Sequence, residues 1–407
     1  MYRPLLVLAL GTFAVGTDGF VVAGILPDIS RSLNVSTSTT GLLVTVFAFT
    51  YGVSAPIMAA TTAHWPRKRL LAIGLLVLTL GNVLSATLPT FGLVLASRVV
   101  AGLGAGMFTP TASSTAASLA PPHQRGRALA IVMAGLSAAT ALGAPIGTVI
   151  GTQINWQATL WFVAALAVLG AAGIGTLMPT VPPAPAIRLR ARLEPMKDSR
   201  VALTLLTTLL VFTGLFTNYT YIAESFDRAT HGNGLTLAVL LFTWGIGATI
   251  GSLGGGRLVD RMPASRIIMT TIVVVSADFA LLPLSSRYLA TALVALIVWG
   301  ICGWATLVVL QHRLVGISPE HATVTIGLNA SATYLAIAAS GLTGAAGISL
   351  VGVHNLGLFG LFFLLVGLLL SLIASRLILR ARSSEPSGVR SRVALPAESA
   401  PEGPAQR

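Results

Sequence analysis

Two ionisable side chains stand inside long apolar segments and are the strongest candidates for chemistry. Asp18 lies in the apolar run 5–27, and Arg98 lies in the run 91–116. An ionised carboxylate inside a membrane span is costly, so it is expected to face a cavity or a partner. Burial disfavours the charged form of a carboxyl group and a nearby cation favours it. A carboxyl group that alternates between these environments carries a proton, and we predict this role for Asp18 over that of a capping or packing aspartate.

Arg98 is the expected partner of Asp18. Asp18 stands nine residues before the outer end of its run, and Arg98 stands seven residues past the outer end of its own. At about 1.5 Å per residue these positions lie about 13 Å and about 10 Å deep, which is nearly the same level. We predict that the two side chains interact, directly or through water. The alternative is that Arg98 binds backbone carbonyls.

The remaining ionisable groups support weaker predictions. Asp278 lies in the run 266–286, where a structural role is favoured over proton coupling. Glu224 and Asp227 close the run 201–222 at a solvated mouth, where Glu224 could attract a cationic substrate. The six histidines lie in loops or at segment ends, Cys302 is the single cysteine, and their spacing predicts no metal site.

The sequence carries no signature of an ATP-driven pump or of an enzyme. A phosphate-binding run of the form G-x-x-x-x-G-K-[ST] is missing from it, so we expect no nucleotide and no other cofactor. No nucleophile and base recur together in the apolar runs. The energy source is therefore expected to be an ion gradient, and the intramembrane carboxylate favours protons over sodium.

The composition predicts the kind of element that holds these residues. Hydrophobic residues form 54% of the 407-residue chain and charged residues 9%, against roughly 25% charged in ordinary globular proteins. Such a chain has too few charges to cover a water-facing surface, so lipid is the expected solvent. The net charge of +13 could indicate nucleic-acid binding, but the bases form short clusters between apolar runs, which is typical of membrane orientation.

Twelve apolar runs are long enough to cross a bilayer, which takes about 20 helical residues. Because backbone in lipid must satisfy its own hydrogen bonds, each run is predicted to be a helix, and the alternation of a β-barrel strand is missing from the pattern. The predicted spans are 5–27, 39–60, 69–88, 91–116, 127–150, 156–178, 201–222, 235–256, 266–286, 289–311, 323–349 and 355–379.

The basic residues fall mainly on one side of these spans. With the N-terminus inside, the inner segments hold 21 of the 25 Lys and Arg residues, and the outer loops hold Arg31, Arg228 and Arg287. This asymmetry predicts that both termini are cytoplasmic. The predicted organisation is a six-helix bundle at 1–178, a basic cytoplasmic linker at 179–200, a second six-helix bundle at 201–380, and a disordered cytoplasmic tail at 381–407.

Four short motifs occur in the spans and in the order typical of one transporter family. They are Gly16-Thr17-Asp18-Gly19-Phe20 in the first span, Arg98 followed by Gly102, Gly104 and Gly106 in the fourth, Gly135 with Gly143-Ala144-Pro145-Ile146-Gly147 in the fifth, and Leu328-Asn329-Ala330-Ser331-Ala332-Thr333-Tyr334 in the eleventh. In these motifs the chain resembles the major facilitator superfamily, and within it the twelve-span drug:proton antiporters such as the chloramphenicol-resistance and arabinose-efflux-like permeases of bacteria. The resemblance covers about residues 5–380. It departs from many relatives at Gly19, where they have Glu.

The resemblance implies a fold and a set of moving parts. The fold would be all-α, with two pseudo-symmetric bundles of six transmembrane helices that rock about a site near the membrane midplane. The fifth-span motif would seal the outer interface between the bundles when the carrier faces inward, and a loop motif would latch the inner side. The residues implied are Gly135, Gly143, Pro145 and Gly147 for the seal, and Gly256, Asp260 and Arg261 for the latch in the second half. In the first half, Ala59 and Ala63 replace the Gly and Asp of the latch.

The substrate cavity is expected between spans one, four, seven and ten of the fold that the chain resembles. A hydrophobic drug needs an apolar cavity with a few polar groups. The candidates are Phe47, Tyr51, Asn218, Tyr219, Tyr221, Trp299, Trp304 and Asn329. Any one of these aromatic residues could instead pack in the core or against lipid. Asn218 and Asn329 are the better candidates because amides are costly in lipid.

Together these features predict a proton-coupled efflux transporter for a small amphipathic drug, chloramphenicol-like or multidrug. We expect a monomer in the bacterial inner membrane whose partners are the small-molecule substrate, protons and lipid, with no nucleic acid. A sugar or nucleoside efflux carrier of the same fold is the first alternative. A non-transporting membrane receptor or scaffold is the second.

Overall fold

The computed structural model describes residues 2–183 and 188–384, and within these ranges the regular secondary structure is entirely helical. Twelve helical segments are long and apolar enough to cross a membrane, which confirms the twelve predicted spans. In chain order they are α1 (Tyr2–Leu33), α2 with α3 (Thr37–Thr40 and Leu42–Thr61), α4 (Arg67–Thr87), α5 (Phe91–Leu119), α6 with η2 and α7 (Arg125–Ala138, Ala139–Gly143 and Ala144–Gln153), α8 (Trp156–Leu177), α10 (Ser199–Thr220), α13 (Gly234–Val259), α14 (Ala264–Ser285), α15 (Leu289–Ile317), η4 with α16 (Pro319–His321 and Ala322–Val351) and η5 with α17 (Val353–Asn355 and Leu356–Ser384).

Short polar residues begin several of these spans. The side chains of Asn155, Asp198 and Asn233 accept hydrogen bonds from the first backbone N–H groups of α8, α10 and α13. Such caps satisfy donors that have no partner inside the helix. Many helices also extend beyond the apolar runs, as α1 does through Leu33, because backbone hydrogen bonding continues into polar residues at the membrane surface.

Some of the connections between spans form small helices of their own. The segment between α8 and α10 contains α9 (Leu189–Leu193) and η3 (Glu194–Lys197). Residues 184–187 of the predicted linker and 385–407 of the predicted tail lie outside the described residues. The last helix continues through Ser384, so the first four residues assigned to the disordered tail are helical.

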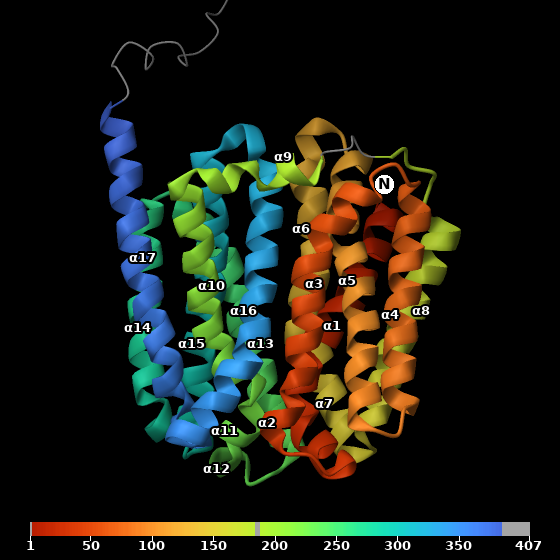
Figure 1. Cartoon of the computed structure of the whole chain (residues 1–407), viewed down its shortest axis with the longest axis vertical. Coiled ribbons are helices and arrows are strands. Elements are labelled where there is room, and N and C mark those ends of the chain that lie inside the picture. Colours follow the sequence, from red (N-terminus) through yellow and green to blue (C-terminus); the bar gives the residue numbers. More distant parts are fainter. Residues whose placement is uncertain (1, 184–187, 385–407) are drawn as a thin grey trace, which may run out of the picture.

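Two seams join the first six spans to the last six. In one, α3 packs along α16, and in the other, η2 and α7 pack against α13. The first residues of α1 and the last turns of α17 lie at the same end of the molecule (Figure 1). At the opposite end of the molecule lie α2, α11 (Ile222–Ser225) and α12 (Asp227–Thr230) (Figure 1).

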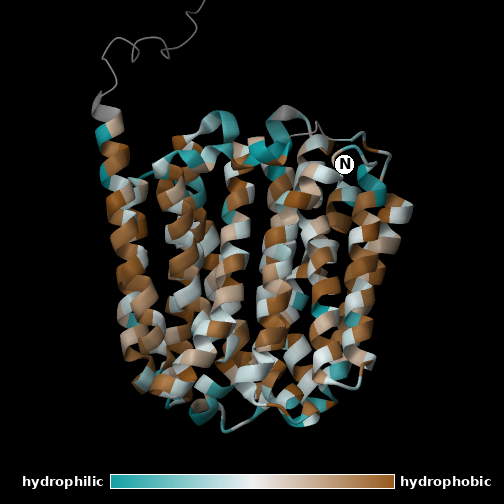
Figure 2. Cartoon of the chain, in the orientation of Figure 1, coloured by the Kyte–Doolittle hydropathy of each residue, from teal (hydrophilic) through white to brown (hydrophobic). Residues whose placement is uncertain are grey.

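Apolar side chains cover the spans on the outside as well as in the core. Leu169, Leu253 and Phe362 are each about 60% exposed. Figure 2 shows hydrophobic residues along the length of the helices and hydrophilic residues gathered at their two ends. An exposed apolar belt of this kind is suited to the hydrocarbon of a bilayer.

Candidate functional site

Asp18 and Arg98 form a buried ion pair inside the first six spans. The guanidinium Nη1 of Arg98 on α5 donates to Oδ1 of Asp18 on α1 over 2.9 Å. The two side chains are 2% and 0% exposed. The structure therefore brings the two predicted residues together by direct contact and without an intervening water.

Asn82 on α4 completes this site. Its Nδ2 donates to Oδ2 of Asp18 over 3.1 Å and to the carbonyl of Leu78 over 3.0 Å. Each carboxylate oxygen thus has its own donor from a different helix. The sequence analysis missed Asn82, although an amide inside the apolar run 69–88 is the same signal that selected Asn218 and Asn329.

Phe47 covers the charged end of Arg98. The guanidinium carbon lies 4.6 Å from the centroid of the Phe47 ring on α3. A cation at this distance from an aromatic face is attracted by the ring, more strongly when water is excluded. Nε of Arg98 is buried and has no hydrogen-bond partner. Asp18 is therefore the charged group that compensates Arg98 here, and breaking such a buried pair by removing one member typically costs about 3–5 kcal/mol.

Tyr51 links this region to the second six spans. It stands one helical turn after Phe47 on α3, and its ring stacks on Tyr334 of α16 with 3.5 Å between centroids and 22° between planes. Both rings lie on the seam between α3 and α16. A chain of contacts therefore runs from the ion pair through Phe47 and Tyr51 to the opposite half.

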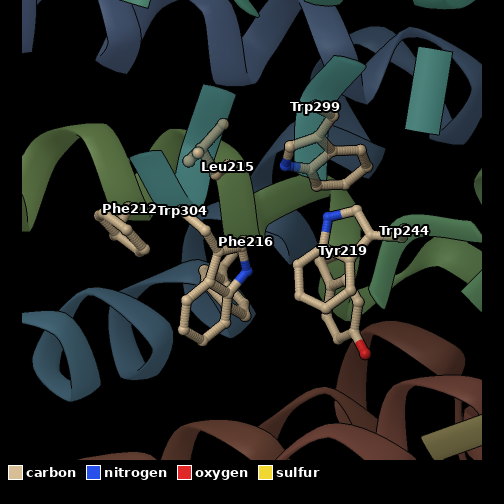
Figure 3. Close-up of a pocket in the computed structure, with 8 residues that line it drawn as sticks. Phe212, Leu215, Phe216, Tyr219, Trp244, Trp299 and Trp304 are labelled. Atoms are coloured by element: carbon tan, nitrogen blue, oxygen red, sulfur yellow. The ribbon is translucent and has the colours of Figure 1, made fainter. Parts of the chain in front are cut away.

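A small aromatic cavity lies among the last six spans. Its volume is about 10 Å³, which is room for about one water molecule, so the side chains themselves fill the site. Its lining comes from α10, α13 and α15: Phe212, Leu215, Phe216, Tyr219, Trp244, Trp299, Gly303 and Trp304 (Figure 3). Three of the predicted cavity residues, Tyr219, Trp299 and Trp304, lie here. Trp244 was missed because it lies in the eighth span, outside the set expected to line the cavity.

Phe20 on α1 reaches the same aromatic residues from the other half of the molecule. Its ring centroid lies 6.0 Å from those of Tyr219 and Trp244. The hydroxyl of Tyr219 donates to the carbonyl of Phe20 over 3.3 Å. Phe20 stands two residues after Asp18, so one helix carries both a charged contact to its own half and an aromatic contact to the other.

The other predicted cavity residues lie apart from this lining. Asn329 on α16 accepts a hydrogen bond from Thr208 of α10 over 2.7 Å, and its Nδ2 is buried without a partner. The hydroxyl of Tyr221 donates to the carbonyl of Gly341 over 2.7 Å, at the end where the two halves meet. Asn218 is buried on α10.

Comparison with known proteins identifies the family. The model of the Major Facilitator Superfamily matches residues 8–341. The chain belongs to this superfamily. The inner membrane transport protein YdhP of Escherichia coli K12 is 31% identical over 346 residues, which are 85% of this chain and 89% of that protein. A chloramphenicol resistance protein of Streptomyces lividans is 35% identical over 268 residues, 65% of this chain and 68% of that protein.

A third relative is named for a different substrate. A probable sugar efflux transporter of Helicobacter pylori G27 is 26% identical over 354 residues, which are 87% of this chain and 90% of that protein. With the family match and the twelve membrane-spanning helices, the chain is a multi-pass membrane transporter with the major facilitator fold.

In this transporter the fifth-span glycines face α1, within the same half. A Cβ at Gly135 would overlap the carbonyl of Ala9, and one at Gly143 would overlap the side chain of Thr17. Gly147 contacts Val21 in the same way. These glycines therefore allow close packing of α1 against α6, η2 and α7. The π-helical turn η2 ends directly before Ala144 and Pro145, and a proline so placed removes a backbone donor from the helix.

Residues next to these glycines contact the other half. Gly245 of α13 packs so closely on η2 that a Cβ there would overlap the backbone of Thr140 and Ala141. The resemblance implies that the motif glycines seal the interface between the halves. In the structure these glycines contact α1 within their own half, and their sealing role stays a prediction.

The second-half latch residues are exposed at the end of α13 that lies on the side of the termini. Gly256, Asp260 and Arg261 all lie at the surface. In the part of the chain that the structure describes, neither Asp260 nor Arg261 forms an ion pair. Their role in gating stays a prediction.

Two further acidic residues lie outside the Asp18 site. Asp278 on α14 is half-buried, and its Oδ2 has no hydrogen-bond partner. Glu224 lies on α11 at the end distal to the termini. Burial raises the pKa of Glu224, the nearby Asp227 raises it further, and a hydrogen bond from Thr37 opposes both. Within residues 2–183 and 188–384, no group of three or more His, Cys, Asp or Glu residues could hold a metal ion.

Proposed function

We propose that this transporter exports a small amphipathic drug in exchange for protons. The observation that carries the proposal is the buried carboxylate of Asp18, held by Arg98 over 2.9 Å and by Asn82 over 3.1 Å. Protonation of Asp18 removes the charge that compensates Arg98, so it weakens the interaction between α1 and α5 by about 3–5 kcal/mol. A change of this size is enough to shift a conformational equilibrium.

The orientation that we propose places both termini in the cytoplasm. The uneven distribution of Lys and Arg supports it. In the half of the bundle distal to the termini, Thr45 donates to the carbonyl of Ala338 over 2.9 Å and Tyr221 donates to that of Ser38 over 3.3 Å. These bonds join the two halves. With the termini inside, the joined end is the outer one.

Exchange follows from linkage between the proton and the drug. Protonation from outside releases Asp18 from Arg98 and favours inward opening. Drug bound from the cytoplasm favours loss of that proton and outward opening. Because both ligands act on one equilibrium between two states, each weakens the binding of the other.

The aromatic cavity supports a drug as the substrate. Seven of its eight lining residues carry apolar or aromatic side chains, and the eighth is Gly303. Cavities of this composition suit amphipathic molecules. The S. lividans relative is named for chloramphenicol resistance, which supports the same substrate class. We place the transporter in the bacterial inner membrane as a monomer without a cofactor, and the name of the E. coli relative supports this location.

Sugar efflux is the second candidate, favoured by the name of the H. pylori relative. A sugar site needs many hydrogen-bonding side chains, whereas Tyr219 supplies the single hydroxyl among the eight residues of the cavity lining. A receptor or scaffold on this fold would show no transport at all.

The test compares the wild type with Asp18→Asn in an efflux-deficient bacterium. We expect the wild type to raise the inhibitory concentration of chloramphenicol or of another drug in a panel, and we expect Asp18→Asn to give no protection at equal expression. Asp278→Asn is the matched control, because it removes another intramembrane carboxylate, and it should protect as the wild type does. Full protection by Asp18→Asn would show that Asp18 is not the coupling residue. Protection by neither protein, with uptake and efflux of labelled arabinose, would favour the sugar carrier.

A further inference from the structure

The ring of Phe20 is enclosed by four aromatic side chains of the opposite half. Its centroid lies 6.2 Å from Phe216, 6.0 Å from Tyr219, 6.0 Å from Trp244 and 6.3 Å from Trp304. We call these four residues the aromatic cage. Phe20 is 5% exposed. A single ring from α1 therefore fills a site that α10, α13 and α15 build.

The ring contacts are those that an aromatic ligand would make. The Phe20 ring lies at 25° to that of Phe216 in a stacked arrangement and meets the Tyr219 ring edge-on at 86°. Offset stacking and edge-to-face contact are the favoured geometries of aromatic pairs. The small cavity of about 10 Å³ adjoins the cage and shares its four residues (Figure 3).

The cage offers an unused hydrogen-bond donor and no charge. Nε1 of Trp244 is buried and has no partner. A buried donor without a partner is unfavourable, and an acceptor on a ligand would relieve this. No residue of the lining is acidic or basic, and the nearby carboxylate of Asp18 is neutralised by Arg98. The unpartnered donor favours a ring that carries a hydrogen-bond acceptor. The aromatic faces would also attract a cation, but no carboxylate in the lining balances its charge.

Asp18 and Phe20 lie on opposite faces of α1. Two residues in a helix of 3.6 residues per turn are separated by about 200° around the axis and about 3 Å along it. Asp18 accordingly contacts α4 and α5, while Phe20 enters the cage. A movement of α1 away from α10, α13 and α15 would therefore withdraw Phe20 from the cage.

We propose that Phe20 occupies the ring position of the substrate in this state, and that the aromatic ring of a neutral substrate replaces it when α1 withdraws. This inference rests on the proposed drug export, because it takes the aromatic cage as the binding site of the exported molecule. Phe20 is then an internal competitor for that site. The apparent affinity for substrate is reduced by the fraction of molecules in which Phe20 fills the cage.

The test measures binding of three labelled probes to the purified full-length protein by equilibrium dialysis without a proton gradient. The probes are chloramphenicol (neutral ring with acceptors), tetraphenylphosphonium (aromatic cation) and arabinose (no ring). We expect Phe20→Leu to tighten chloramphenicol binding by about fivefold, because the competing ring is gone. Trp244→Phe should weaken it by about threefold or more, because the indole donor is lost.

Phe108→Leu is the matched control for Phe20→Leu. Phe108 is a fully buried phenylalanine of α5 in the same half, and it lies against Gly11 outside the cage. We expect Phe108→Leu to leave chloramphenicol binding unchanged. If the control variant does not fold, Phe20→Trp provides the second comparison. A larger ring at residue 20 should weaken chloramphenicol binding while the cage residues stay intact.

Several results would overturn the inference. One is a Phe20→Leu protein that elutes as the wild type does and binds chloramphenicol equally or more weakly. Failure of both proteins to bind chloramphenicol is another, and stronger binding of tetraphenylphosphonium or arabinose would contradict the ligand class. Because the assay has no proton gradient, its result does not depend on whether Asp18 couples transport to protons. Tighter binding by Phe20→Leu together with full protection by Asp18→Asn would retain the cage and reject the proposed proton site.

Discussion

At Asp18, one carboxylate receives donors from two different helices. Arg98 of α5 supplies charge and Asn82 of α4 supplies an amide. Phe47 shields the guanidinium from the seam side. While these helices stay together, the carboxylate keeps a compensating cation and a donor to each of its oxygens.

Replacement of Asn82 by Leu should lower drug-driven proton release. The substitution removes the donor to Oδ2 and leaves that oxygen buried without a partner, which is unfavourable by about 1–3 kcal/mol. Drug-driven proton release measured in vesicles at several pH values tests this. Ser85→Ala is the control, since Ser85 lies on the same helix and bonds to Ser97. Unchanged proton release in Asn82→Leu would contradict a role for the amide in coupling.

At the scale of elements, glycine positions decide how close the helices approach. On α13, Gly245 meets the backbone of η2, whereas Gly254 of the same helix has open space where a Cβ would be. One helix thus carries a glycine that the packing requires and one that it does not. The same contrast holds on α6 between Gly135 and Gly126.

Gly245→Ala should weaken the seal and reduce transport, whereas Gly254→Ala should not. The added methyl group at residue 245 has no space without separation of α13 from η2, and overpacking of this kind typically destabilises by about 1–3 kcal/mol. Alanine at residue 254 replaces a helical glycine in open space and should be neutral or slightly stabilising. Thermal unfolding and drug efflux of the two variants give the comparison. Equal effects of both substitutions would argue against a seal at Gly245.

Glu224 on the short helix α11 should make the free energy of unfolding depend on pH. Burial raises the pKa of Glu224 above its unfolded value, so the folded state binds this proton more tightly than the unfolded chain. The stabilising contribution is present below the unfolded pKa and is lost as the pH rises through the folded pKa. Glu224→Gln should therefore lose less stability than the wild type between acidic and neutral pH. Glu194→Gln, at an exposed pair with Lys197, is the control, and identical pH curves for the wild type and Glu224→Gln would contradict the prediction.

For the whole molecule, transport requires that the two seams open and close in alternation. Contacts of Thr45 with Ala338 and of Tyr221 with Ser38 hold the end distal to the termini together. At the other end, Asp260 and Arg261 lie exposed and unpaired among the described residues. A complete cycle must reverse this difference between the two ends.

A disulfide between Thr45→Cys and Gly341→Cys should stop transport reversibly. A Cβ at Gly341 would touch the side chain of Thr45, so the two Cβ atoms lie close enough for a disulfide. The double variant, made with Cys302→Ala, should lose efflux on oxidation and regain it on reduction. Each single-cysteine variant should transport under both conditions. Undiminished efflux by the fully cross-linked protein would show that this seam does not open in the cycle.

The sequence by itself determined the twelve spans and the depth of Asp18 and Arg98. Both follow from local physics, because a bilayer sets the length of an apolar helix and the helical rise sets the level of each residue. The motifs further placed the chain in its family. The apolar runs did not predict the helix ends, such as Leu33 and Ser384, because these helices continue past the runs into polar residues.

The tertiary structure alone decided which residues meet. In a membrane protein the lipid-facing side of a helix is as apolar as the core-facing side, so periodicity does not reveal which face packs inward. Asn82, Phe20 and Trp244 were not among the predicted site residues, although each of the three contacts a predicted site residue directly. Their positions result from how α1, α4 and α13 pack. That packing depends on many contacts between residues that are far apart in the sequence.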